Sequence, residues 1–241
     1  MFIYNKNLFD DRCERFIQSA EKYKDSFDLL YNNALDSVCK KEYAKGCFAL
    51  HLGYYSPSYE ELYVGGVKRG RLLKSGNTNY DYEYWYDEYG KMICSIFHTG
   101  GAKDQKYDKY YEFFIYKNGK CDLSVEYNKS IILGALIFSI SEYKINGTKL
   151  TELARAVFSM DQKPNEIKVE QSEYENELLS AAIISDYIPA AIISDYIPAA
   201  NIINNRKLTF YRDDDGRIAK YLMQELDEYG NQVDDGYVYD V

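Results

Sequence analysis

Two histidines and five cysteines are the side chains of this chain best suited to nucleophilic or metal chemistry. His51 and His98 each lie in an apolar, strand-like stretch without a second ligand at the spacing that metal sites use. The cysteines are widely spaced and form no C-x-x-C pair, which is typical of reduced core thiols. A nucleophilic pair of Cys47 or Cys94 with a histidine stays open, because only the fold decides whether they meet. We predict structural histidines, no metal site and no cofactor.

Two glycine-containing loops are superficially similar to ligand-binding motifs. Gly65-Gly66-Val67-Lys68-Arg69-Gly70 lacks the Lys-Ser/Thr ending of a P-loop and the spacing of a dinucleotide-binding turn. Asp213-Asp214-Asp215-Gly216 lacks the D-x-D-x-D-G spacing and the distal glutamate of a calcium loop. We therefore predict a basic loop at the first position and a hairpin turn at the second.

Carboxylates and tyrosines leave a second kind of chemistry open. Glycosidases use two carboxylates at a defined separation, and this chain has 38 acidic residues to supply them. The chain also has 27 tyrosines, and Tyr80, Tyr82, Tyr84 and Tyr86 alternate with other residues, so we expect them to share one face of a strand. If the N-terminal helix covers that face, they belong to the core. If the face is exposed, it is an aromatic ladder for protein or carbohydrate.

The elements that must position these side chains begin with a helical layer. Apolar residues recur at three- and four-residue steps from Phe16 to Val38. Asp11 and Glu14 fit the capping-box spacing loosely, and Gly46 follows Lys45 as a helix stop. The pattern predicts one long helix, or two, over residues 11–45, with an apolar face that must lie against a sheet.

A β-meander is expected over residues 47–158, where the period changes to two. Its hairpins turn at Asp87-Glu88-Tyr89-Gly90, at Asn118-Gly119 and at Asn146-Gly147, whose residues tolerate positive φ angles. Residues 150–158 fit a strand or a helix, and propensity does not decide between them.

A duplicated segment follows within residues 166–204. Ala182-Ile183-Ile184-Ser185-Asp186-Tyr187-Ile188-Pro189-Ala190 is repeated without a change as residues 191–199, which indicates a recent duplication. Upstream, Tyr174, Leu178 and Leu179 have helical spacing, and each copy ends in Ile-Pro, where helices break. We predict a helical insertion extended or looped by one redundant copy.

Acidic residues are concentrated in the C-terminal hairpin predicted over residues 206–241. Residues 208–241 carry nine acids and three bases, whereas the whole chain has a net charge of −9. Such a face steers a basic partner and speeds its association. The acidic residues that we expect to contact a partner are Asp213, Asp214, Asp215, Asp227, Glu228, Asp234 and Asp235.

Several classes of protein are disfavoured by composition. The longest strongly apolar run, residues 131–140, is too short for a membrane-spanning helix, and the N-terminus does not have the pattern of a signal peptide. The acidic net charge argues against nucleic-acid binding. We therefore expect a cytoplasmic protein that folds as a single α+β domain over residues 1–241, with a helical layer on an antiparallel meander.

Two of the hairpins carry a family resemblance. Residues 84–93, YWYDEYGKMI, and residues 210–218, FYRDDDGRI, resemble the aromatic, Asp-and-Gly hairpins of cytosolic immunity proteins from bacterial polymorphic-toxin systems. The resemblance implies a protein without catalytic residues that binds and blocks a cognate toxin domain. The helical part and the duplicated segment have no counterpart in that family.

The sequence thus favours a non-catalytic protein-binding module whose partner is a basic protein. A hydrolase with paired carboxylates is one alternative. A self-associating structural module, joined through edge strands or the duplicated segment, is another. The oligomeric state stays open.

Overall fold

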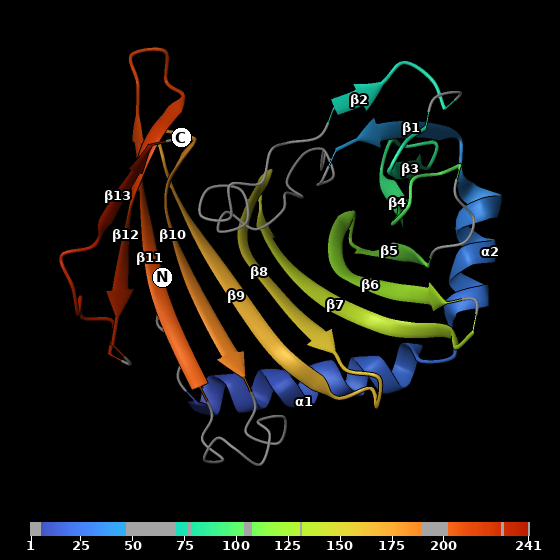
Figure 1. Ribbon diagram of the computed structural model, residues 1–241, viewed down its shortest axis with the longest axis horizontal. Coiled ribbons are helices and arrows are strands. Elements are labelled where there is room, and N and C mark those ends of the chain that lie inside the picture. The colour runs from blue at the N-terminus through green and yellow to red at the C-terminus, as the bar shows by residue number, and fades with distance from the viewer. Residues whose placement is uncertain are drawn as a thin grey trace. The chain divides into compact units, whose positions relative to one another are not determined.

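The computed structural model describes residues 6–46, 71–76, 79–103, 108–130, 132–188, 202–227 and 229–240 (Figure 1). Two helices, α1 (Lys6–Tyr23) and α2 (Phe27–Ser37), precede thirteen strands in these ranges. Within the described ranges, neither helix combines the length and apolar character needed to cross a bilayer. The strands are β1 (Lys40–Lys45), β2 (Arg71–Leu73), β3 (Tyr82–Tyr86), β4 (Met92–His98), β5 (Lys109–Lys117), β6 (Lys120–Ser130), β7 (Gly134–Asn146), β8 (Lys149–Phe158), β9 (Pro164–Glu175), β10 (Leu178–Ile188), β11 (Ile202–Arg212), β12 (Ile218–Leu226) and β13 (Tyr237–Asp240).

The strands form an antiparallel sheet in which most strands lie beside their neighbours in the chain. The order runs from β13 to β3 without interruption, and β1 then lies between β3 and β2. The predicted Asn-Gly turn joins β5 to β6, with positive φ angles of 51° at Asn118 and 80° at Gly119. The predicted α+β class and β-meander are confirmed, although the helical part is smaller than expected.

The helical layer predicted over residues 11–45 is wrong at both ends. α1 begins at Lys6, and α2 ends at Ser37, because Val38 adopts the extended angles φ −68° and ψ 120°. Residues Lys40–Lys45 form β1, in which Ala44 lies opposite Tyr82 of β3. Pairing with β3 satisfies the backbone hydrogen bonds of this segment, so a tertiary contact outweighs the local helical pattern.

The helical insertion predicted within residues 166–204 is also wrong for the described residues. β9 and β10 form a hairpin that turns at Asn176 and Glu177, which both have positive φ angles. β-Branched residues such as Val169 and Ile184 favour strands. The residues with helical spacing lie on both sides of the turn, since Tyr174 belongs to β9 and Leu178 to β10. The first copy of the duplicated segment lies in β10 up to Ile188, and the second copy lies outside the described residues. Residues 150–158, left open above, belong to strand β8.

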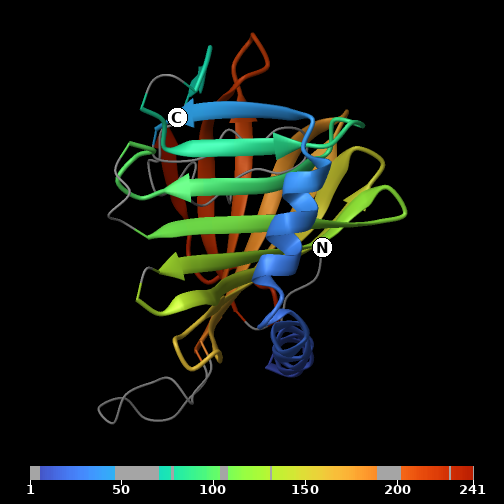
Figure 2. The same ribbon diagram turned by 90° about the vertical axis from the view of Figure 1, so that its right-hand side faces the viewer.

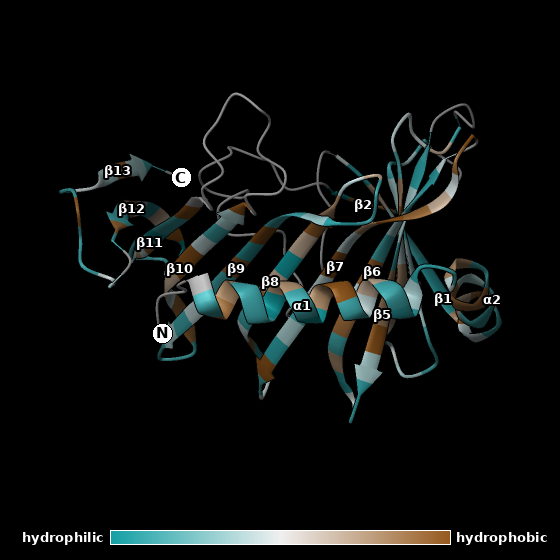
Figure 3. Cartoon of the chain, turned by 90° about the horizontal axis from the view of Figure 1, so that it is seen from below, coloured by the Kyte–Doolittle hydropathy of each residue, from teal (hydrophilic) through white to brown (hydrophobic). Residues whose placement is uncertain are grey.

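The chain forms two compact units. The described residues of Met1–Phe16, Tyr143–Val157 and Pro164–Val241 make up the first unit, and those of Ile17–Glu142 and Phe158–Lys163 make up the second. Their apolar residues alternate with polar ones along the strands and along α1, as Figure 3 shows. Each unit therefore buries its own set of side chains, and each is described below by itself.

In the first unit, the N-terminal half of α1 is held by aromatic and ionic contacts. Phe9 stacks on Tyr187 of β10 with ring centroids 4.9 Å apart, and the Tyr187 hydroxyl donates to Asp10 at 3.1 Å. Arg12 Nη2 lies 2.7 Å from Glu152 Oε1, and both side chains are buried. Burial by itself would raise the pKa of Glu152, but hydrogen bonds and attraction from Lys144 and Arg12 outweigh it, so the pKa lies below its usual value.

In the second unit, α2 lies against the sheet and contacts β5 (Figure 2). Two of its aromatic side chains, Phe27 and Tyr31, make contacts with the strands. Phe27 makes edge-on contacts with Tyr111 and Tyr127, at centroid distances of 5.3 Å and 5.5 Å. Tyr31 lies 5.8 Å from Trp85 of β3. α2 therefore covers the face of β3 that carries Trp85, which is opposite to the face of the alternate tyrosines.

Candidate functional sites

The tyrosine ladder belongs to the core of the second unit. Tyr82, Tyr84 and Tyr86 share one face of β3, and none of the three is more than 9% exposed. The rings of Tyr82 and Tyr84 are nearly parallel, with centroids 6.1 Å apart. Tyr80 precedes β3 and donates instead to Glu83, on the other face. The ladder is thus buried without being covered by α2, a combination that neither sequence-based alternative contained.

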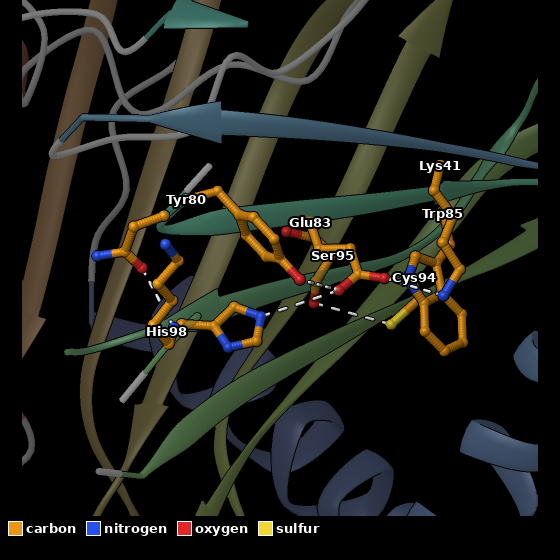
Figure 4. A network of polar contacts seen from close by, with 9 residues as sticks. Lys41, Tyr80, Glu83, Trp85, Cys94, Ser95 and His98 are labelled. Atoms are coloured by element: carbon orange, nitrogen blue, oxygen red, sulfur yellow. Dashed lines mark hydrogen bonds and ion pairs between the residues drawn. The ribbon is translucent and has the colours of Figure 1, made fainter. Parts of the chain in front are cut away.

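Glu83 is the centre of a polar network on the face that α2 covers (Figure 4). Its Oε1 accepts hydrogen bonds from Lys41 Nζ at 2.9 Å and from Trp85 Nε1 at 2.6 Å. Its Oε2 accepts from the Tyr80 hydroxyl at 3.2 Å and lies 4.0 Å from His98 Nε2. The carboxylate therefore links β1, β3 and β4.

His98 and Cys94 lie beside this network, and their pKa shifts do not favour nucleophilic catalysis. His98 is buried, and its pKa is lowered by that burial and by Lys109, against the opposing effects of Glu83 and Asp81. Burial likewise raises the pKa of Cys94, whose thiol donates to the Ser95 carbonyl. A nucleophilic pair needs a thiolate, whereas this thiol stays protonated and the imidazole beside it is neutral. The two side chains therefore fit a structural role better than a nucleophilic one.

Several residues considered in the sequence cannot be placed. His51, Cys47 and the basic loop at residues 65–70 lie outside the described residues. Among the described residues, no group of three or more His, Cys, Asp or Glu side chains is arranged to hold a metal ion.

The structure brings together a carboxylate pair that sequence reasoning missed. Glu112 of β5 lies directly opposite Glu126 of β6, and their row continues through Ser95 to Tyr84 of the ladder face. The Ser124 hydroxyl donates to Glu112 at 2.7 Å. A matching hydroxyl, that of Ser139, donates to Glu126 at 2.7 Å. Counting outward from the Asn-Gly turn would have paired Glu112 with Val125, because the register shifts by one residue between Tyr116 and Ile115.

The acidic residues of the C-terminal hairpin divide into structural and available carboxylates. Asp213 Oδ1 accepts from the Arg217 amide at 2.8 Å, and Asp227 Oδ1 accepts from the amides of Tyr229 and Asn231. Asp87 holds the turn between β3 and β4 by the same contacts. In the described residues, Asp214, Asp215 and Asp235 are exposed, whereas Asp234 accepts from the Glu225 amide; Glu228 lies outside the described part.

These acids lie at two separate ends of one strand. Asp213, Asp214 and Asp215 lie in the turn before β12, whereas Asp227, Asp234 and Asp235 follow its last residue. A strand of nine residues measures about 27 Å between its first and last residues. The predicted acidic face is therefore two acidic ends joined by β12, and a small ligand does not reach both.

Comparison with known proteins does not place the chain in a family. No protein-family model matches the sequence, and no curated protein matches it significantly. The resemblance of its hairpins to immunity proteins therefore stays a prediction.

Proposed function

We propose that this chain is a non-catalytic protein-binding module that holds a basic protein domain against its acidic C-terminal hairpin. In the form that the hairpin resemblance implies, the bound domain is a toxin and the module neutralises it. The observation that carries the proposal is the separation of the exposed acids to both ends of β12.

The separation suits a partner of protein size. A standard protein–protein interface buries about 800 Å² on each partner, which corresponds to a patch about 28 Å across. β12 has nearly this length, so one globular domain can contact Asp215 and Asp235 at the same time. Positive charge on that domain would be steered toward the hairpin, and added salt would slow the association.

The test neutralises only carboxylates that the hairpin turns do not use. Asp214, Asp215 and Asp235 are changed together to Asn, and binding to candidate basic toxin domains is measured by surface plasmon resonance at two salt concentrations. We expect at least tenfold weaker binding, mainly through a slower association rate, and a shallower dependence on salt.

A matched control removes the same charge from the other compact unit. Asp28, Asp36 and Asp122 are also exposed, and changing all three to Asn should leave the affinity within twofold. Equal losses in both triple variants would mean that net charge, rather than the hairpin, governs binding, and the proposal would be wrong.

A second candidate function, hydrolysis of a glycan or another small substrate, is favoured by the position of Glu112 opposite Glu126. Residues directly opposite in antiparallel strands have Cα atoms about 4.5–5.5 Å apart, which permits the short carboxyl separation of retaining glycosidases. Aromatic side chains are found on the same strands, since Tyr110 of β5 packs edge-on against Phe138 of β7 with ring centroids 4.9 Å apart.

The two functions are separated by an activity screen with aryl glycosides. Hydrolysis that disappears in both E112Q and E126Q, but persists in D122N, would establish the second function. Asp122 is a suitable control because it is an exposed acid on the same strand as Glu126. Absence of hydrolysis across the panel would leave protein binding as the only proposed function.

A further inference from the structure

The outer strand of the C-terminal hairpin is exposed along its whole length. β13 pairs with β12 alone among the described strands and lies at the end of the strand order. All four of its residues are exposed, with Tyr237 at 64%, Val238 at 63% and Tyr239 at 36%. An edge strand of this kind presents unpaired backbone amides and carbonyls to any extended chain that approaches it.

An aromatic row runs across the hairpin toward that edge. Phe210 of β11 lies opposite Tyr221 of β12, which lies opposite Tyr239 of β13. The rings of Tyr221 and Tyr239 stack at 4.9 Å, and exposure rises from 1% at Tyr221 to 36% at Tyr239. A further strand beyond β13 would extend the row and cover the exposed ring of Tyr239.

The charges around β13 indicate which kind of strand could pair with its free edge. Asp240 ends the strand, and Asp235 precedes it, so both ends of the edge are negative. Like charges disfavour pairing between two copies of β13, whereas lysine or arginine on an incoming strand would be attracted. The strand contains no lysine or proline, which are residues that protect natural edge strands.

We propose that β13 binds an extended, basic segment of a partner protein by strand addition. The proposal rests on the protein-binding function proposed above and names the mode of binding at the same hairpin. Backbone hydrogen bonds would supply affinity, Tyr237 and Tyr239 would pack on one face of the added strand, and the carboxylates would select basic side chains.

The test uses a synthetic peptide with blocked ends, in which four lysines alternate with three valines. A second peptide has the same sequence but carries methyl groups on the amide nitrogens of its three central residues, so it keeps its charge and cannot pair along either edge. Binding of both to the full chain is measured by calorimetry, and amide hydrogen exchange is followed at Tyr237–Asp240. We expect the unmethylated peptide to bind at least tenfold more tightly and to protect these amides.

Two variants of the chain test, independently of the methylated peptide, whether the peptide binds at β13. Y239A should weaken binding at least fivefold, because it removes the ring that the added strand covers. Y229A is the matched control, because Tyr229 is 80% exposed in the adjacent turn and lies outside β13, and its binding should be unchanged.

The outcomes distinguish the mode of binding from the function. Equal binding of both peptides, sensitive to salt, would overturn strand addition and leave the acidic hairpin as a binding surface. Failure of both peptides to bind would also overturn strand addition, while the triple-variant experiment would still decide the proposed function. Dimers of the free chain that Y239A dissociates would identify a second copy as the occupant and contradict the proposal.

Discussion

At the scale of single residues, the carboxylates of Glu152 and Glu83 have structural roles. Arg12 and Glu152 hold α1 in the first unit, and Glu83 holds three strands of the second unit with the help of Lys41. A buried carboxylate with several donors is costly to disturb, because removing one partner leaves the other charge desolvated.

Replacing Glu152 by Gln should therefore destabilise the first unit. The change removes the negative charge that the buried Arg12 guanidinium faces at 2.7 Å, so we expect the free energy of unfolding at pH 7 to fall by about 3 kcal/mol. Because the folded pKa of Glu152 is lowered, its contribution is complete above pH 4.5 and is lost as the pH falls through the folded pKa. Urea unfolding measures the difference.

The matching control for this change is Glu21→Gln. Glu21 of α1 pairs with Lys24, which directly follows the helix, and both side chains are exposed, so the ion pair contributes little. A change above about 0.5 kcal/mol in this variant, or none in E152Q, would contradict the assigned difference.

His98 should make stability depend on pH below neutrality. Its folded pKa lies below 6.5, so the unfolded chain binds the proton more readily, and the stabilisation present above pH 6.5 is lost as the pH falls. Replacing His98 by Gln should flatten the dependence between pH 7.5 and 5.5 in urea unfolding. Identical slopes for the two proteins would show that His98 is not the group responsible.

At the scale of elements, a recurrent hairpin turn explains the distribution of several aspartates. The first residue of the turn accepts backbone amides through its carboxylate, and the fourth is a glycine with positive φ, as at Asp87 and Gly90 (φ 74°). The turn at Ser159 has the same backbone pattern, with Gln162 at φ 60° in the glycine position. The motif is thus a property of the hairpins and carries no catalytic meaning.

Two neighbouring substitutions test this assignment within one turn. Asp213→Ala removes the acceptor for the Arg217 amide and should lower the free energy of unfolding by about 1 kcal/mol. Asp214→Ala in the same turn should change it by less than about 0.5 kcal/mol, because surface substitutions away from such contacts have small effects. Similar losses from both, measured by thermal unfolding, would refute the structural role of Asp213.

The duplicated segment gives a second test for the elements. Residues 189–201 connect β10 to β11, and deleting residues 191–199 shortens this connection without removing a described strand residue. Loop closure depends weakly on length, so the melting temperature followed by circular dichroism should stay nearly unchanged. Loss of folding in the deletion would show that the second copy is an essential part of the structure.

At the scale of the whole molecule, the location of charge matters more than its total. The net charge of −9 keeps the chain acidic overall, and the exposed aspartates of the C-terminal hairpin concentrate the imbalance at β12 and β13. Charge of this kind affects the encounter with a partner more than the stability of the fold.

Because both triple variants lose three negative charges, they should behave alike in properties that depend on net charge. We expect the D214N/D215N/D235N and D28N/D36N/D122N proteins to have the same mobility in native electrophoresis and the same isoelectric point. Only the first variant should bind a basic partner more weakly. Different mobilities would indicate a change in folding or assembly and would disqualify the comparison.

The local pattern of the chain was sufficient to predict several of the hairpins and their turns. Asn118-Gly119 and Asp213-Asp214-Asp215-Gly216 encode positive φ angles and backbone hydrogen bonds within a few residues, so their conformation depends little on distant contacts. The alternation of Tyr82, Tyr84 and Tyr86 likewise predicted that they share a face. The meander followed from these short-range signals.

Tertiary structure decided the features that depend on pairing and burial. β1 and β10 carry patterns that also fit helices, and hydrogen bonding to neighbouring strands selected the extended form. The register of β5 and β6 placed Glu112 opposite Glu126, and the direction of β12 separated the acids into two ends. Charge and residue type can be read from the sequence. Contacts between distant segments form only on folding, when these segments replace their contacts with water by contacts with one another.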